Sequence, residues 1–343
     1  MGYYSYLEWM AKNTPTQWCN DSAIPKEMED AIQFGGAIGC TSNPPLSYQA
    51  LVANPALYQD EVAQIPEGLN RDDRALALIG CVVRELSRRL MPMYQATNKQ
   101  YGYIRTQVRP ELANDGEAML EMGKIMATWG ENVMVKIPGT KAGVWALEEL
   151  AACGIATNPT VCIATSQALA VADAYERGRA RAIAAGITPA PSTAAVVMGR
   201  LSDYMLQKDP NANAESLQWA VLAVIKNIFA EYAKRDYHSQ LMPAAFRTAF
   251  QVSELSGAEC CMTIHPKIQK LVAEADAAGQ LVRECRFDVP VEQKHLDYAA
   301  SLFPEFEKAY YADGLTIDEF DSYGPILFTL DGFDKGWRQL YEL

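Results

Sequence analysis

The stretch Glu131-Asn-Val-Met-Val-Lys-Ile-Pro-Gly-Thr140 places a lysine inside a short apolar run that is typical of a buried β-strand. Alternation along a strand puts Lys136 on the same face as Met134 and Pro138, near the carboxyl end of the strand. Residues 141–153 follow directly and have a helical pattern. The stretch therefore predicts one buried strand followed by one helix.

The same unit recurs from about residue 16 to residue 265. The short apolar runs are residues 18–19, 37–41, 103–108, 133–137, 156–163, 193–198, 240–244 and 259–264. Strand–helix alternation predicts an all-parallel sheet, and eight units favour a closed barrel over an open doubly wound sheet. No glycine-rich phosphate loop follows the first run, which argues against a dinucleotide-binding fold. The predicted fold class is α/β, a (β/α)8 TIM barrel with extra helices and a helical C-terminal tail.

The chain is expected to divide into two parts. Residues 1–285 form the barrel, with a helical insertion at about 47–100 between the second and third strands. Residues 286–343 form a helical extension that packs on the barrel, acidic and aromatic, with a turn near Asp313-Gly314. This extension is either a small appended subdomain or a cap over the barrel.

Composition limits the classes of function. The formal net charge is −12 over 343 residues, and Lys and Arg alternate with Asp and Glu, so nucleic acid is not an expected partner. No run of about 18 uncharged apolar residues exists, and residues 1–18 lack a signal-peptide pattern, so we expect no membrane span and a cytoplasmic location. The eight cysteines and three histidines have no metal-ligand spacing, so we expect no metal site and cysteines that are mostly small buried hydrophobes.

Lys136 is unusual because it is a charged residue within an apolar strand. A lysine enclosed by apolar neighbours loses hydration, which lowers its pKa and leaves more neutral amine near neutral pH. A neutral amine can attack a carbonyl to form a Schiff base. The carboxyl end of a barrel strand is also where barrel enzymes build their active sites. The alternative is a strand-end lysine whose ammonium simply reaches solvent.

Polar clusters stand at the ends of three other predicted strands. They are Trp18-Cys-Asn-Asp-Ser22, Gly39-Cys-Thr-Ser-Asn-Pro-Pro-Leu46 and Thr157-Asn-Pro-Thr-Val-Cys-Ile163. Each alone is explained by ordinary turn chemistry. Because the carboxyl ends of barrel strands meet at one mouth, we expect these clusters to surround Lys136.

With these residues the sequence resembles the transaldolase family over most of residues 16–270. The segment 39–46 resembles the family motif G-x-T-[ST]-N-P-x-L, and residues 133–138 resemble its nucleophile strand. Val197-Met-Gly-Arg-Leu201 and Ala245-Phe-Arg247 resemble its two arginine motifs. The match is specific because it holds in order and spacing along the chain.

The resemblance implies a role for several residues. Lys136 would form a Schiff base with a ketose and retain a dihydroxyacetone unit after carbon–carbon cleavage. Asp21 resembles the first-strand acid that handles protons, and Thr160 resembles the threonine that holds the catalytic water. Asn43 and Asn158 resemble the amides that orient substrate hydroxyls.

The resemblance also implies the substrate class and the partners. Arg200 and Arg247 match the arginines that hold the phosphate of a sugar phosphate, which suits the planar donor fork of a guanidinium. The alternative for each is a surface ion pair. No metal or organic cofactor is required, and the resemblance suggests a homodimer in carbohydrate metabolism, within the pentose phosphate pathway.

Three positions depart from the family pattern, and Val197 bears on the first of them. Gln107 stands where the family has a catalytic glutamate, and an amide can position water but cannot accept its proton. Fructose 6-phosphate aldolases share this glutamine but pair it with a tyrosine at the position of Val197. Ala195 and Ala245 replace serines, each loss removing a hydrogen bond worth about 1 kcal/mol.

Three hypotheses follow. The first is a transferase that moves a dihydroxyacetone unit from a ketose to an aldehyde. The second is a lyase that releases free dihydroxyacetone, favoured by Gln107 and disfavoured by Val197. The third is a non-catalytic relative that binds a sugar phosphate. His265, after the last strand, is expected to have a structural role, and the aromatic tail is expected to pack against the barrel.

Overall fold

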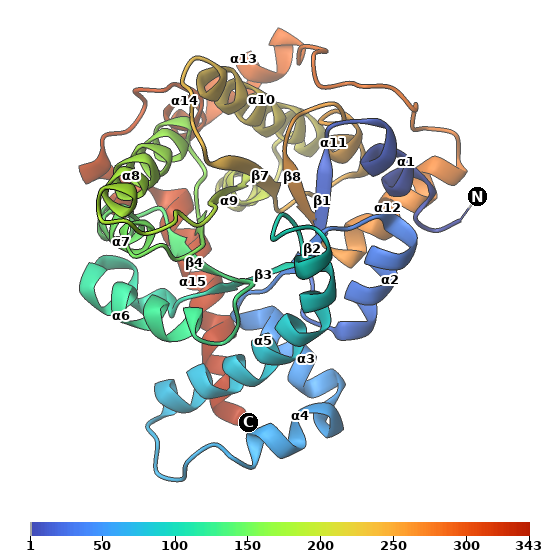
Figure 1. The fold of residues 1–343 in the computed structure, drawn as a ribbon. Helices are drawn as coiled ribbons and strands as arrows, with labels where there is room; N and C mark the ends of the chain where they lie inside the picture. Colours follow the sequence, from blue (N-terminus) through green and yellow to red (C-terminus); the bar gives the residue numbers. More distant parts are fainter. Residues whose placement is uncertain (1) are drawn as a thin grey trace.

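The computed structural model describes residues 2–343, in which eight parallel strands form a ring enclosed by helices (Figure 1). The strands are β1 Gln17–Asn20, β2 Gly39–Thr41, β3 Tyr103–Gln107, β4 Val133–Pro138, β5 Thr157–Thr160, β6 Thr193–Val197, β7 Gln240–Ala244 and β8 Cys261–Ile264. Each of the eight predicted apolar runs overlaps one strand. The predicted TIM barrel is confirmed.

The ring is built from two sheets. Six strands are hydrogen-bonded in the order β5-β4-β3-β2-β1-β8, and β6 and β7 form a separate parallel pair. Isolated bridges join Thr157 to Ser192 and Cys162 to Val196, which connects β5 to β6. Strands β7 and β8 lie side by side and complete the ring. We call the two parts the six-stranded wall and the two-stranded wall.

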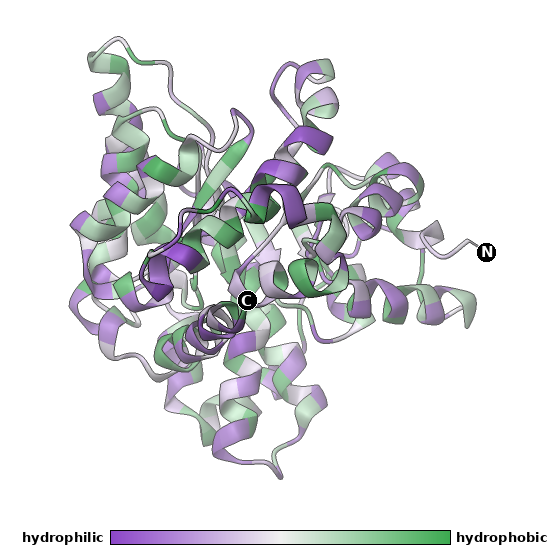
Figure 2. Ribbon diagram, turned by 90° about the horizontal axis from the view of Figure 1, so that it is seen from below, coloured by the Kyte–Doolittle hydropathy of each residue, from purple (hydrophilic) through white to green (hydrophobic). Residues whose placement is uncertain are grey.

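Helices follow the strands as the alternation predicts. Around the barrel lie α1 Ser5–Asn13, α2 Pro25–Gly35, α6 Gly116–Ala127, α7 Lys141–Ala152, α8 Thr165–Ala184, α9 Met198–Lys208, α10 Ala214–Ala233, α11 Ala249–Ser253 and α12 Pro266–Ala277. Between β2 and β3 lie α3 Pro44–Ala53, α4 Pro55–Val62 and α5 Arg71–Ala96, where the helical insertion was predicted. Figure 2 shows these helices divided between hydrophilic and hydrophobic stretches.

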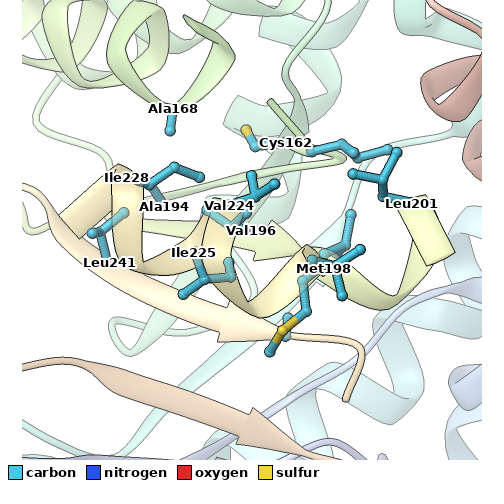
Figure 3. Packing of buried hydrophobic residues seen from close by; sticks show 14 of the residues in the cluster. Cys162, Ala168, Ala194, Val196, Met198, Leu201, Val224, Ile225, Ile228 and Leu241 are labelled. Carbon is cyan, nitrogen blue, oxygen red and sulfur yellow. The ribbon is translucent and has the colours of Figure 1, made fainter. Parts of the chain in front are cut away.

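The main hydrophobic core fills the space between strands and helices. On β6, Ala194 and Val196 point outward and pack with Ile225 and Ile228 of α10 and with Leu241 of β7 (Figure 3). The residues that alternate with them on β6 therefore face the barrel interior. This alternation fixes which side chains of β6 can reach a ligand at the barrel mouth.

The C-terminal tail packs on the helices around the barrel, and its last helix contacts α3 and α9 at the carboxyl ends of the strands. It consists of α13 Gln293–Leu302, α14 Pro304–Tyr310 and α15 Gly324–Gln339. Helix α15 packs on α3 so closely that a Cβ at Gly336 would lie 2.2 Å from Pro45. Trp337 is fully buried and donates from Nε1 to Asp72 Oδ1 at 3.1 Å. The predicted turn at residues 313–314 is present, and the division at residue 285 stays a prediction.

Two expected absences concern the described part of the chain. Within residues 2–343 no helix is long and apolar enough to cross a membrane. The same residues contain no group of three His, Cys, Asp or Glu side chains that could hold a metal ion. Six of the eight cysteines are buried, whereas Cys153 and Cys285 are exposed.

Candidate active site

Two cavities lie at the carboxyl ends of the strands. The inner cavity, about 60 Å³, is enclosed by the barrel, and the outer cavity, about 370 Å³, lies toward α9 and α12. Both are lined by Asp21, Asn43, Arg200, Ala245 and Phe333. Six of the eight predicted site residues line the inner cavity: Asp21, Asn43, Lys136, Asn158, Thr160 and Arg200.

Lys136 is enclosed rather than reaching solvent. Its side chain is on the inner face of β4, the residue is 6% exposed, and Nζ donates to the Ser42 carbonyl at 3.1 Å. No carboxylate forms an ion pair with it among the residues that the structure describes. Burial lowers the pKa of Lys136 to about 8, with the Asp21 charge opposing this shift and Arg105 adding to it. About a tenth of the amine is then neutral at pH 7, far more than for an ordinary lysine.

Gln107, Lys136 and Asn158 occupy one row across three adjacent strands, because they pair in register on β3, β4 and β5. Neither polar atom of the buried Gln107 amide has a hydrogen-bond partner. Asn158 Oδ1 and Thr160 Oγ1 are likewise buried without partners. Buried polar atoms are rarely left unpaired, so their concentration beside Lys136 indicates a place for a polar ligand or water.

Asn158 is oriented by an irregularity in the sheet. The Thr157 N–H donates to the Pro191 carbonyl at 3.1 Å, and the next such bond would come from residue 159 to the Thr193 carbonyl. Pro159 has no N–H to give. Asn158 Nδ2 donates to that carbonyl instead, and also to Thr193 Oγ1 at 2.9 Å. Its other amide atom, Oδ1, is thereby left as an acceptor with no protein partner.

Asp21 and Asn43 have partners that limit what they can do. Thr41 Oγ1 donates to Asp21 Oδ1 at 2.7 Å and lies 2.6 Å from Thr263 Oγ1. Asn43 caps α3, accepting at Oδ1 from the Leu46 N–H at 3.0 Å. The capping bond uses one lone pair of Asn43 Oδ1, and the amide nitrogen forms no hydrogen bond in the described chain, so it is the freer contact for a substrate hydroxyl.

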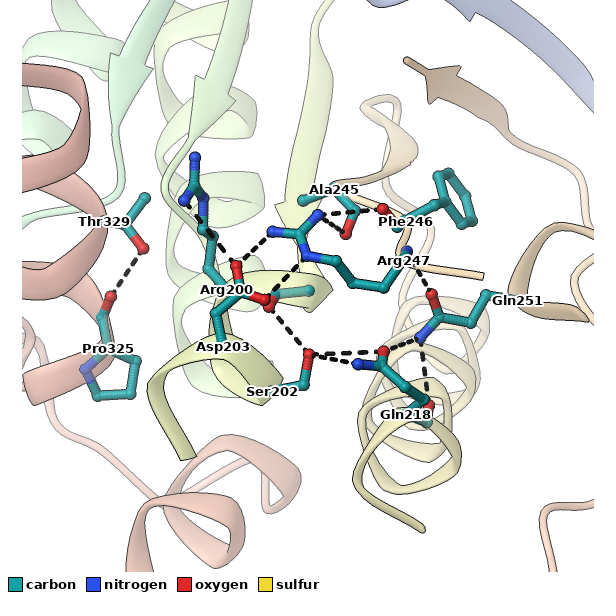
Figure 4. A network of polar contacts seen from close by, with 11 residues as sticks. Arg200, Ser202, Asp203, Gln218, Ala245, Phe246, Arg247, Gln251, Pro325 and Thr329 are labelled. Carbon is teal, nitrogen blue, oxygen red and sulfur yellow. Dashed lines mark hydrogen bonds and ion pairs between the residues drawn. The ribbon is translucent and has the colours of Figure 1, made fainter. Parts of the chain in front are cut away.

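The two arginines differ in their surroundings (Figure 4). Arg247 forms a two-point ion pair with Asp203, at 2.9 Å from Nε and 2.5 Å from Nη2. Arg200, in the first turn of α9, reaches the same carboxylate only at 4.0 Å, and its buried Nε has no partner. Its guanidinium lies over the Phe333 ring at 5.5 Å, and burial together with Arg247 lowers its pKa. Arg200 therefore retains more capacity to bind an anion than Arg247. Arg247 instead forms an ion pair, which was the alternative to anion binding.

Backbone strain marks the same mouth. Val161, directly after β5, and Ala245, directly after β7, have φ of 57° and 60°, and a β-branched residue rarely adopts such a value. Strain of this kind is retained chiefly at functional sites. Gly199, near the start of α9, lies against the same segment. A Cβ at Gly199 would lie 2.0 Å from the Ala245 carbonyl, so only glycine lets α9 start so close to the end of β7.

Two lining residues carried no chemical role in the sequence analysis. Phe333 comes from the tail helix α15 and contacts both cavities, although it lies 197 positions after Lys136 (333 − 136). Nothing in its local sequence distinguishes it from a packing residue. His265 lines the outer cavity and caps α12, its Nδ1 accepting from the Lys267 N–H at 3.1 Å. This contact agrees with its predicted structural role.

Comparison with known proteins extends these observations. Residues 18–309 match the family described as Transaldolase/Fructose-6-phosphate aldolase. Transaldolase 1 of Streptomyces avermitilis is 30% identical over 224 residues, 62% of this chain and 59% of that protein. Transaldolase 2 of a Nostoc species is 32% identical over 180 residues (51% and 47%), and the transaldolase of Neisseria gonorrhoeae is 35% identical over 154 residues (44% of each).

The aligned regions thus span about half the length of these curated relatives. The family match is wider, since it extends from β1 to the end of α14. The barrel, the enclosed lysine and the resemblance in motif all agree with it. This chain belongs to the transaldolase/fructose-6-phosphate aldolase family.

Proposed function

We propose that the protein transfers a dihydroxyacetone unit from a ketose, or ketose phosphate, to an aldehyde through a Schiff base on Lys136. The observation that carries the proposal is the enclosed lysine itself. It is buried, its pKa is lowered to about 8, and it is paired with a carbonyl rather than with a carboxylate. Such an amine is available to attack a substrate carbonyl.

The reaction begins when the Lys136 amine adds to the ketone carbonyl and water leaves, which gives a protonated imine. Asp21 accepts the proton of the substrate hydroxyl beside the bond that breaks. That hydroxyl becomes the carbonyl of the leaving aldehyde, and the electron pair of the broken bond moves into the imine to give an enamine. The enamine then adds to an acceptor aldehyde by the reverse steps, and water frees the lysine.

The groups around Lys136 support this order of reaction steps. The Thr41 hydroxyl fixes Asp21 at the mouth, and the unpaired amide and hydroxyl atoms of Asn158 and Thr160 stand ready for hydroxyls or water. Arg200 lines the outer cavity at the end of the barrel, where the phosphate of an extended sugar would lie. Arg247 contributes a second guanidinium to the same cavity, although Asp203 neutralises part of its charge.

One observation favours a second candidate, a lyase that releases free dihydroxyacetone. Gln107 stands beside Lys136 with both amide atoms unpaired, so it can hold a water that protonates the enamine before an aldehyde arrives. Release of dihydroxyacetone from fructose 6-phosphate without any acceptor would favour the lyase. Retention of the unit on the protein until an aldehyde is added would favour the transferase.

Trapping of the imine tests the proposal directly. The protein is incubated with fructose 6-phosphate or dihydroxyacetone, treated with borohydride, and weighed intact. We expect a mass gain that Lys136→Ala abolishes and that Lys141→Ala, which changes an exposed lysine five residues away, leaves unchanged. No gain with either compound, in protein shown to be folded, would contradict the Schiff base and favour a sugar-phosphate-binding protein without catalysis.

A further inference from the structure

A third cavity lies at the opposite, amino end of the barrel. Its volume is about 330 Å³. Gln17, Tyr103, Thr193 and Gln240, the first residues of β1, β3, β6 and β7, line it together with Arg105. We call it the amino-end cavity. It shares no lining residue with the inner or the outer cavity.

Arg105 is the unusual member of this group. It is 4% exposed and extends across the barrel from β3, donating from Nε to Thr193 Oγ1 at 3.2 Å and from Nη1 to Cys19 Sγ at 3.4 Å. It forms no ion pair with any carboxylate in residues 2–343. A guanidinium stays charged under all ordinary conditions, and a buried charge without a counter-charge is expensive. The structure thus contains an enclosed cation with two neutral partners and an open cavity beside it.

The rest of the cavity suits a small polar ligand. The amides of Gln17 and Gln240 are half-buried at its rim and form no side-chain hydrogen bond in the described chain. Ser192 lines the wall beside Thr193, although its hydroxyl already accepts a hydrogen bond from Thr157 Oγ1 at 3.0 Å. Glu259, an exposed residue at the rim, is the one carboxylate among the lining residues. Uncharged donors around one buried guanidinium are a common arrangement for binding an oxyanion.

We infer that the amino-end cavity binds a small oxyanion, a phosphate or carboxylate group, with the Arg105 guanidinium as its counter-charge. This site is separate from the catalytic mouth and from Arg200 and Arg247. A free anion and the anionic end of a larger metabolite share this chemistry. Inorganic phosphate serves as the probe for a phosphate group and acetate as the probe for a carboxylate group.

The site is connected to the catalytic residues by one hydroxyl. Thr193 Oγ1 accepts from Arg105 Nε at 3.2 Å and from Asn158 Nδ2 at 2.9 Å. An anion that attracts Arg105 toward the amino end weakens the first bond and frees Thr193 for the second. The amino-end cavity is therefore placed to influence the amide beside Lys136 without touching substrate.

An internal counter-ion is the competing explanation. Cys19 Sγ lies 3.3 Å from Cys261 Sγ, and the hydrogen bond from Cys261, with a contribution from Arg105, lowers the pKa of Cys19. A Cys19 thiolate would supply the negative counter-charge for Arg105 from inside the barrel, so no bound anion would be needed to balance the guanidinium. In that case phosphate would not bind at this end, and the pH at which Cys19 loses its proton would not depend on phosphate.

The test uses Arg200→Met, which weakens anion binding at the catalytic mouth, and titrates it with phosphate and acetate by calorimetry at fixed ionic strength. We expect one remaining anion-binding site. Gln240→Glu should lower the affinity of that site about tenfold, because it adds a negative charge at the rim that repels the anion. Gln64→Glu adds the same charge on an exposed surface outside all three cavities and is expected to leave binding unchanged. Arg105→Met should abolish the site.

Gln240→Glu keeps the test informative if Arg105→Met fails to fold, since Gln240 is only half-buried, at the rim of the cavity. Binding of phosphate or acetate that responds to Gln240→Glu and not to Gln64→Glu supports the proposal, and the tighter of the two identifies the ligand chemistry. Absence of binding in Arg200→Met, or binding that Gln240→Glu leaves unchanged, overturns it.

Discussion

The two walls of the barrel present opposite chemistry to the same cavity. The six-stranded wall contributes Asp21, Thr41, Lys136, Asn158 and Thr160, all polar. The inward residues that the two-stranded wall gives to the inner cavity are apolar: Ala195, Val197, Met242 and Ala244. The groups proposed to react are thus gathered on one side, and the side chains on the other side offer no hydrogen bonds to a ligand.

The family departures fall mainly on the apolar side. Ala195 lies on β6 and Ala245 follows β7, whereas Gln107 is the one departure on the six-stranded wall; Val197, where the aldolase branch has tyrosine, also lies on β6. The groups that would form and cleave the imine are retained, and hydroxyl contacts to substrate are missing. We infer that the two-stranded wall, together with Arg200 beyond it, sets which substrate is accepted.

The pH dependence of imine formation should show the largest effect of the polar wall. Since the pKa of Lys136 is lowered to about 8, the rate of adduct formation with dihydroxyacetone should rise between pH 6 and pH 8 by about 50-fold and then level off. Samples quenched into borohydride and weighed give the rate. A midpoint near that of a free lysine would contradict the enclosed, neutral amine.

The same shift has a consequence for folding. The folded-state pKa of Lys136 lies below the unfolded value, so the folded protein binds fewer protons and is destabilised by this group at every pH below about 8. That cost fades as the pH rises from 8 toward the unfolded pKa. Lys136→Met should therefore be more stable than the natural protein at pH 7, as measured by urea unfolding.

Arg200→Met tests the charged group beyond the apolar wall. Loss of a charged hydrogen bond of about 1.5–3 kcal/mol should raise KM for fructose 6-phosphate roughly 10- to 100-fold. Adduct formation with unphosphorylated dihydroxyacetone should be unchanged. Arg177→Met, which removes an exposed arginine on α8, is the matched control. An equal loss with both substrates would show that Arg200 acts on structure rather than on phosphate.

Gln107→Glu would add a second carboxylate to the polar wall, in register with Lys136. A nearby negative charge favours the ammonium form, so the midpoint of the pH profile should move upward and the rate at pH 7 should fall about tenfold. The profile of quenched adducts between pH 6 and pH 10 measures this shift. An unmoved midpoint would mean that the two side chains do not interact.

The smallest effect is expected from restoring one hydroxyl to the apolar wall. Ala195→Ser adds a hydrogen bond to substrate worth about 1 kcal/mol, or about fivefold in kcat/KM. Ala194→Ser, one position earlier and directed into the core, should give no gain and should lower stability because it buries an unpaired hydroxyl. Equal changes in kcat/KM and in stability for the two variants would contradict the assignment of Ala195 to the inner face of β6 and Ala194 to its outer face.

The sequence predicted the fold well because its information is local. Each strand is a short apolar run bounded by helical periodicity, and Lys136 stands out within one of them. Relations between distant segments were not accessible in this way. The stacking of Phe333 on Arg200 and the reach of Arg105 to Thr193 depend on packing across the whole barrel. The division into two walls also escaped prediction, because strand pairing is not encoded in any single run.

The bond from Asn158 to Thr193 ties catalysis to the construction of the barrel. Since Pro159 has no N–H to bond to β6, the Asn158 side chain, which lines the cavity together with Lys136, also helps to hold the two walls together. Replacement of Asn158 would therefore disturb both the lining of the cavity and the contact between β5 and β6. Any residue that replaced Asn158 would have to provide this bond as well as a substrate contact, because Pro159 leaves no backbone donor to take over.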